Sequence, residues 1–174
     1  LHDALPILVI FGLVTYATKG VSFGAIEPAI PKMIIPKING FPTIILWAVA
    51  AIVIVWFIWN KTTFGKNLYA VGGNPEAAAV SGISVFGVTM GAFILAGILY
   101  GFGSWLECAR MVGSGSAAYG QGWEMDAIAA CVVGGVSFTG GIGKISGVVV
   151  GVLIFTVLIY SLTILGIDTN LQFV

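Results

Sequence analysis

The residues that most invite a chemical interpretation lie near position 140, where a lysine follows a run of glycines. A phosphate-binding loop needs a glycine, four further residues, and then Gly-Lys followed by Ser or Thr, because backbone amides and the lysine surround the phosphates. Here Phe138 stands in the place of the leading glycine, and Ile145 follows Lys144. We therefore predict that this chain does not bind a nucleotide.

Side chains that could form a metal site or a catalytic set are sparse. Cys108 and Cys131 form no CxxC pair, have no histidine nearby and lie in apolar stretches, so we predict inert, buried thiols and no metal site. The sequence holds no Ser-His-Asp set, and the middle of each long apolar stretch is uncharged. We predict that the chain is not an enzyme and has no cofactor of its own.

The single histidine, His2, lies in the opening string LHDALPI. This string resembles the translation of a sequencing adapter, so we interpret residues 1–7 as a non-native artefact and give His2 no role. The first residue is Leu1 rather than Met, and the closing NLQFV starts another apolar stretch. We therefore expect residues 8–174 to be part of a longer domain.

A short helix is predicted inside the polar stretch 61–82. Asn74 is a good N-cap, Pro75 suits the first helical position, and Glu76 is an acid in the first turn. Gly82 can end the helix, which predicts a helix over 75–81 with the small residues 77–79 on its face. Two interpretations remain open here: an ordinary capped loop helix, or an element that a cleft on a partner protein grips.

Composition identifies the solvent that surrounds these residues. Of the 174 residues, 59% are hydrophobic and 8% are charged, the mean hydropathy is +1.09 and the net charge is zero. A soluble domain has roughly 25% charged residues, whereas a bilayer accommodates this balance. The chain has no dense basic patch, so we predict contact with lipid and none with nucleic acid.

Apolar stretches long enough to cross a membrane set the predicted architecture. They cover residues 41–60, 83–106 and 145–167, with a shorter stretch at 8–18. Residues 127–143 are uncharged but rich in glycine, so we expect a short or broken helix, whose irregular backbone must be buried in protein or line a cavity. The prediction is an all-α, polytopic transmembrane bundle of about four to five membrane segments, joined by polar stretches at 19–40 and 61–82.

Three pairs of glycines are spaced as GxxxG, which lets helices approach closely in lipid. The pairs are Gly87 and Gly91, Gly97 and Gly101, and Gly147 and Gly151. We interpret them as packing sites within one bundle rather than as a dimerisation motif. Glu107 and Arg110 are spaced to form an ion pair at a helix end.

Two long stretches resemble a known transporter family. TTFGKNLYAVGGNPEAAAVSGISV resembles the cytoplasmic coupling loop of the permease subunits of ribose-, xylose- and galactose-type ABC importers, and EMDAIAACVVGGVSFTGGIGKISGVVVGVLIF resembles the second characteristic stretch of these subunits. The resemblance covers most of residues 41–174. It is closest to the galactose/methyl-galactoside branch, on WNKTTFGKN, GGNPEAA, ECAR and DAIAACVVGGVSF. The stretch 8–40 matches only loosely, and the IPKMIIPKI segment is a departure from the family pattern.

The resemblance implies a function and a set of partners. Two permease subunits, here expected as a homodimer, form the path through the bacterial inner membrane, a cytoplasmic ATPase binds ATP and magnesium, and an external or periplasmic sugar-binding protein delivers a monosaccharide. It also implies that residues 61–82 and Lys144 are cytoplasmic and that residues 19–40 are external. The count of lysines in the two loops favours the opposite orientation by one charge, and we give the resemblance precedence.

The resemblance also assigns roles to residues. It implies an ATPase-coupling element made of Gly72, Gly73, Asn74, Pro75, Glu76, Ala77, Ala78, Ser81 and Gly82. It further implies contributions to the translocation path from Glu124, Asp126, Gly134, Gly135, Ser137, Gly140 and Gly141. Two alternatives stay open for the second group: Glu124 and Asp126 could be ordinary acids in the first turn of a helix, and the glycines could serve close helix packing.

Three other functions remain as alternatives. A permease for another small solute, such as an autoinducer or a nucleoside, could use the same scaffold, and the sequence does not settle the solute. An ion-coupled secondary carrier often places ionisable groups within the membrane, and the clear spans have none. A membrane-embedded enzyme would need a catalytic set at membrane depth, and we find none.

Overall fold

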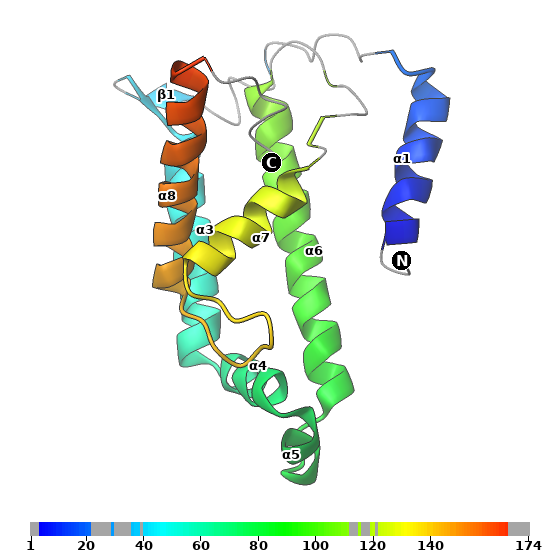
Figure 1. The fold of residues 1–174 in the computed structure, drawn as a ribbon, viewed down its shortest axis with the longest axis vertical. Helices are drawn as coiled ribbons and strands as arrows, with labels where there is room; N and C mark the ends of the chain where they lie inside the picture. Colours follow the sequence, from blue (N-terminus) through cyan, green and yellow to red (C-terminus); the bar gives the residue numbers. More distant parts are fainter. Residues whose placement is uncertain are drawn as a thin grey trace. The chain divides into compact units, whose positions relative to one another are not determined.

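The computed structural model describes residues 4–21, 29, 36–38, 40–111, 115, 119, 120 and 122–166. Figure 1 shows the helices that these residues form. In chain order, the elements are α1 (Ala4–Thr18), β1 (Lys37–Ile38), β2 (Phe41–Pro42), α3 (Ile44–Lys61), α4 (Thr63–Gly73), α5 (Pro75–Val80), α6 (Val85–Arg110), α7 (Trp123–Val133) and α8 (Ile145–Ile164). The two compact units of the chain comprise residues 1–49 with 95–121, and residues 50–94 with 122–174.

Among the described residues, three helices are long and apolar enough to cross a membrane. They are α3, α6 and α8, with mean hydropathies of 2.1, 2.0 and 2.5, and α1 adds a shorter apolar helix over Val9–Thr18. Most of their large apolar side chains face outward. A soluble protein buries such side chains, whereas a membrane helix presents them to lipid. The predicted all-α membrane architecture is therefore confirmed, including a short helix, α7, which begins before the stretch 127–143 and ends ahead of its glycines.

The polar stretch 61–82 contains more helix than expected. The segment 61–82 contains a further helix, α4, that the sequence analysis did not predict. The Thr62 hydroxyl caps this helix by accepting a hydrogen bond of 3.2 Å from the Gly65 amide, and it also donates one of 2.5 Å to the Ile58 carbonyl. The glycines of α4 lower its intrinsic helix propensity, and the cap together with tertiary contacts offsets this.

A small hairpin precedes α3, where a polar connection and the start of an apolar span were expected. β1 and β2 pair antiparallel, with Lys37 opposite Pro42 and Ile38 opposite Phe41. The Asn39-Gly40 sequence between the strands is a strong signal for a two-residue turn, and Gly40 adopts a φ of +84°. The other predictions for residues 19–40, and those for residues 1–3 and 167–174, lie outside the described residues.

Candidate functional site: the coupling element and the glycine loop

The predicted coupling element, residues 72–82, contains a residue, Asn74, that joins two helices. The Asn74 amide donates to the Ala70 carbonyl at 3.0 Å and so closes α4, while its side-chain Oδ1 accepts from the Ala77 amide at 3.0 Å and so caps α5. Asn74 itself is extended, with φ −154° and ψ 101°, which turns the chain between the helices. The predicted capping, with Pro75 first and Glu76 in the first turn, is confirmed.

The element ends in a well-defined C-cap. Gly82 has a φ of +81°, and its amide donates to the Ala79 carbonyl while the Ile83 amide donates to the Ala78 carbonyl, both at 3.0 Å. This pair of bonds is the Schellman motif, which favours glycine because a Cβ strains the left-handed conformation. Ser81, predicted as the last helical residue, is the C-cap, and its hydroxyl donates to the Ala77 carbonyl at 2.8 Å.

Most of α5 is open to a partner. Among its small residues Ala78 is buried, whereas Ala77 and Ala79 are exposed, and the Val80 side chain is 91% exposed. Ala78 is therefore the alanine that packs inward, whereas the exposed alanines on either side form a small, smooth surface. Glu76, also exposed, supplies its negative charge.

The end of α4 lies against residues 140 and 141 of the loop between α7 and α8. We call residues 134–144 the glycine loop. A Cβ built on Gly72 would lie 2.7 Å from the Gly141 nitrogen, and one on Gly140 would lie 2.5 Å from the Gly72 carbonyl oxygen. The Tyr69 hydroxyl also donates to the Gly143 carbonyl at 2.7 Å. The coupling element therefore meets two of the predicted path residues, Gly140 and Gly141, which are far from it in sequence.

Two shallow hollows adjoin this contact. One, of about 350 Å³, includes Tyr69, Gly72, Ser137, Gly140 and Gly141 in its lining. The other, of about 400 Å³, includes Gly134 and Gly135. The five path residues predicted in the glycine loop thus all border open space, and glycines dominate because the backbone turns sharply there.

Glycines also join α7 to α8. A Cβ on Gly134 would lie 2.5 Å from the Gly147 carbonyl oxygen, and one on Gly151 would overlap the Ala130 carbonyl oxygen and lie 2.6 Å from the Gly134 nitrogen. The packing interpretation is therefore confirmed for Gly147 and Gly151. A Cβ on Gly91 would meet the Phe64 ring, whereas Gly97 and Gly101 have open space within 4 Å.

Glu124 and Asp126 lie away from the glycine loop. Both are in the first turn of α7, whose N-cap Gly122 makes no side-chain capping bond. Acids there complement the helix dipole, so the structural interpretation accounts for their position. The 11 residues of α7 rise roughly 16 Å, which separates these acids along the helix from the path glycines at its other end.

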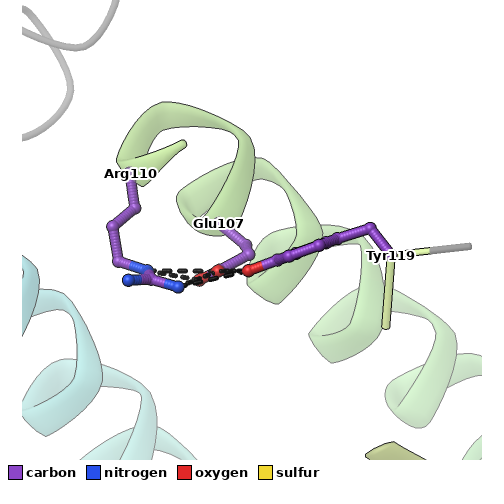
Figure 2. A network of polar contacts seen from close by, with 3 residues as sticks. All are labelled: Glu107, Arg110 and Tyr119. Atoms are coloured by element: carbon purple, nitrogen blue, oxygen red, sulfur yellow. Dashed lines mark hydrogen bonds and ion pairs between the residues drawn. The ribbon is translucent and has the colours of Figure 1, made fainter. Parts of the chain in front are cut away.

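A polar network lies at the C-terminal end of α6 (Figure 2). The predicted pair forms: the Arg110 Nε donates to both Glu107 carboxylate oxygens, at 3.1 and 3.0 Å, and Nη2 adds a further contact. Tyr119 joins it, since its hydroxyl donates to Glu107 at 2.6 Å and accepts from Arg110 at 3.2 Å. The bond to the carboxylate raises the pKa of Tyr119 above its ordinary value. No sequence signal pointed to Tyr119, because a loop separates it from α6.

Metal-binding side chains do not gather in the part of the chain that the structure describes: it holds no group of three His, Cys, Asp or Glu residues placed to bind an ion. The two thiols differ from each other. Cys131 is partly buried, but Cys108 is exposed on α6, so the prediction of a buried thiol is wrong for Cys108.

The architecture and the two sequence stretches agree with a transporter family. The family model described as "branched-chain amino acid transport system / permease component" matches residues 5–173. The chain belongs to this permease family. It is a multi-pass protein of the inner membrane, as its apolar helices require. The match includes residues 5–7, and the interpretation of residues 1–7 as an artefact stays a prediction.

Individual relatives are named for sugars. The galactose/methyl galactoside import permease protein of Treponema pallidum is 56% identical over 96% of this chain and 33% of the relative. The protein of the same name from Escherichia coli is 51% identical over 75% of this chain and 39% of the relative. The ribose import permease protein of Bacillus subtilis is 41% identical over 78% of this chain and 42% of the relative. The resemblance to sugar permeases is thus confirmed. The chain spans about a third to two fifths of the length of these relatives, and no solved structure matches it.

Proposed function

We propose that this chain is part of the membrane-spanning permease subunit of an ATP-driven ABC importer that moves a monosaccharide, of the galactose/methyl-galactoside type or a related hexose or pentose, across the inner membrane. The observation that carries the proposal is α5: a helix capped at both ends and largely exposed, between the spans α3 and α6. The identity to relatives named as galactose/methyl galactoside import permeases supports the choice of solute.

The partners follow from this assignment. A cytoplasmic ATPase would bind ATP and magnesium, grip residues 72–82 and hydrolyse ATP, so the permease chain itself would catalyse no reaction. A second permease subunit would complete the path, and an external sugar-binding protein would deliver the solute. Residues 61–82 and Lys144 would then face the cytoplasm.

The small, smooth surface of α5 suits a coupling role. Exposed alanines permit close contact without ordering long side chains, which lowers the entropic cost of docking. The double capping by Asn74 and Gly82 makes α5 a rigid body, so displacement by a closing ATPase would move it as a unit. ATP would bias which side of the membrane the path opens to, by favouring one of two arrangements of the spans.

A second solute class has one observation in its favour. The family model that matches the chain is described for branched-chain amino acid transport, so its scaffold is not restricted to sugars. Import of another small solute, such as an autoinducer or a nucleoside, on this scaffold is therefore the alternative. An ion-coupled secondary carrier is less favoured, because its transport would not need an exposed coupling helix.

Crosslinking tests the proposal directly. In the full-length protein, with Cys108 and Cys131 replaced by serine and alanine, single cysteines at Glu76 and Val80 should crosslink to the partner ATPase in a manner that depends on ATP. A cysteine at the buried Ala78 is the matched control and should crosslink poorly. If the exposed positions are instead labelled from outside the cell and do not reach the ATPase, the topology is inverted and the importer assignment is wrong.

A further inference from the structure

Tyr69 and Gly72, at the end of α4, contact residues 140–143 of the glycine loop. We propose that this α4–loop contact is the link through which movement of the coupling element reaches α7 and α8, and that Gly72 and Tyr69 are its positioning residues. The inference rests on the proposed function and adds to it a route from the ATPase-facing helix to the path.

The first part of the contact is backbone against backbone. A Cβ on Gly72 would lie 2.7 Å from the Gly141 nitrogen, and one on Gly141 would lie 2.6 Å from the Gly73 Cα. Gly140 and Gly141 have φ values of +88° and +70°, which an L side chain rarely adopts. Since main chain meets main chain, no rotamer change can absorb a displacement. A shift of α4 must therefore move the loop.

The second part is a hydrogen bond on the preceding turn of α4. The half-buried Tyr69 hydroxyl donates to the Gly143 carbonyl at 2.7 Å, across 74 residues of sequence. A single contact at Gly72 would let the loop pivot about one point. A second attachment at Tyr69 also fixes its direction, so the loop follows rotation of α4 as well as translation.

Both ends of this contact continue into rigid structure. On one side, Asn74 bonds simultaneously to α4 and α5. On the other side, Gly134 begins the loop and packs against Gly147 and Gly151 of α8. A continuous series of packed elements thus runs from α5 through α4 and the glycine loop to the α7–α8 pair, all within one compact unit. Packed elements of this kind can transmit coupling between distant sites.

Two neighbouring glycines provide a matched test. Gly72 and Gly73 are both helical and both near the end of α4, so alanine at either changes helix propensity in the same direction. A Cβ on Gly72 meets the loop backbone, whereas one on Gly73 meets nothing within 4 Å. We would reconstitute the full-length importer with its ATPase and binding protein in lipid vesicles, and measure galactose uptake and ATP hydrolysis together.

The expected result is a selective loss of coupling. Gly72→Ala should lower the sugar moved per ATP hydrolysed by about tenfold relative to Gly73→Ala, within the usual range of coupling between sites. Tyr69→Phe, which removes one hydrogen bond and keeps the ring, should lower it by about threefold. ATP hydrolysis should remain near the wild-type rate in Tyr69→Phe, which lies outside the coupling element, a separation that simple loss of fold would not produce.

The outcomes separate the two proposals. If the wild type transports and Gly72→Ala and Tyr69→Phe retain the sugar-to-ATP ratio of Gly73→Ala, the link is wrong while the importer stands. A parallel fall of uptake and hydrolysis in Tyr69→Phe also overturns it, since it indicates only a structural role. Where Gly72→Ala does not assemble, Tyr69→Phe decides alone. A wild type without ATP-driven uptake of galactose or a related monosaccharide overturns the proposed function, and this inference with it.

Discussion

The two compact units hold their elements together in different ways. In the unit of residues 95–121 with 1–49, the described contacts outside the β1–β2 hairpin are made by side chains: the Trp47, Phe102 and Trp105 rings, with centroids 6.0–6.2 Å apart, and the Glu107 network. In the unit of residues 50–94 with 122–174, the close approaches are made by glycine backbone. Side chains can adjust by rotation, whereas backbone surfaces in contact move only together. The comparison suggests that the glycine-rich unit is the one suited to transmit motion.

The largest expected effect tests the rigidity of the α7–α8 contact. Gly151→Ala should destabilise the full-length protein by about 1–3 kcal/mol, because its Cβ would meet the Ala130 carbonyl and Gly134 backbone. Thermal unfolding in detergent measures this. Gly101→Ala is the control on another span, since a Cβ there has open space within 4 Å. Equal losses in the two variants would show that glycine contacts confer no special rigidity.

An intermediate effect concerns Asn74, whose side chain caps α5 at the point where α4 and α5 meet. Asn74→Ala should cost about 0.5–2 kcal/mol of local stability, because the Ala77 amide loses its cap. Crosslinking of a cysteine at Val80 to the ATPase should then fall, as α5 frays. Asn74→Asp retains an acceptor and should restore the yield. If alanine and aspartate behave alike, the cap does not set the position of α5.

The smallest effect is expected in the side-chain unit. Arg110 is largely exposed, so the Glu107–Arg110 pair should contribute only about 0.2–1 kcal/mol in a double-mutant cycle with Glu107→Gln and Arg110→Gln. Tyr119→Phe should change stability by a similar amount. Thermal unfolding of the full-length variants checks both. A coupling energy as large as the Gly151→Ala effect would remove the contrast between the units.

The sequence by itself determined the membrane class, the spans and the short helix α5. These depend on local properties: the length of uncharged apolar runs, the capping preference of Asn74, the fixed φ of Pro75 and the conformational freedom of Gly82. The family could also be recognised from the sequence, because each of its two characteristic stretches is an unbroken run of residues. The role of residues 72–82 in coupling and that of residues 134–141 in the path remain predictions.

Only the tertiary structure decided which residues meet. Helix α4 was missed because Gly65, Gly72 and Gly73 lower its local propensity, and the structure shows that Gly65 and Gly72 instead permit close packing against Trp59 and the glycine loop. Tyr69 and Gly143 are 74 residues apart, and Glu107 and Tyr119 are separated by a loop. Glycine has no side chain from which its neighbour could be inferred. Contact between two glycine backbones therefore leaves no pattern in either stretch alone, and it exists only once the chain has folded.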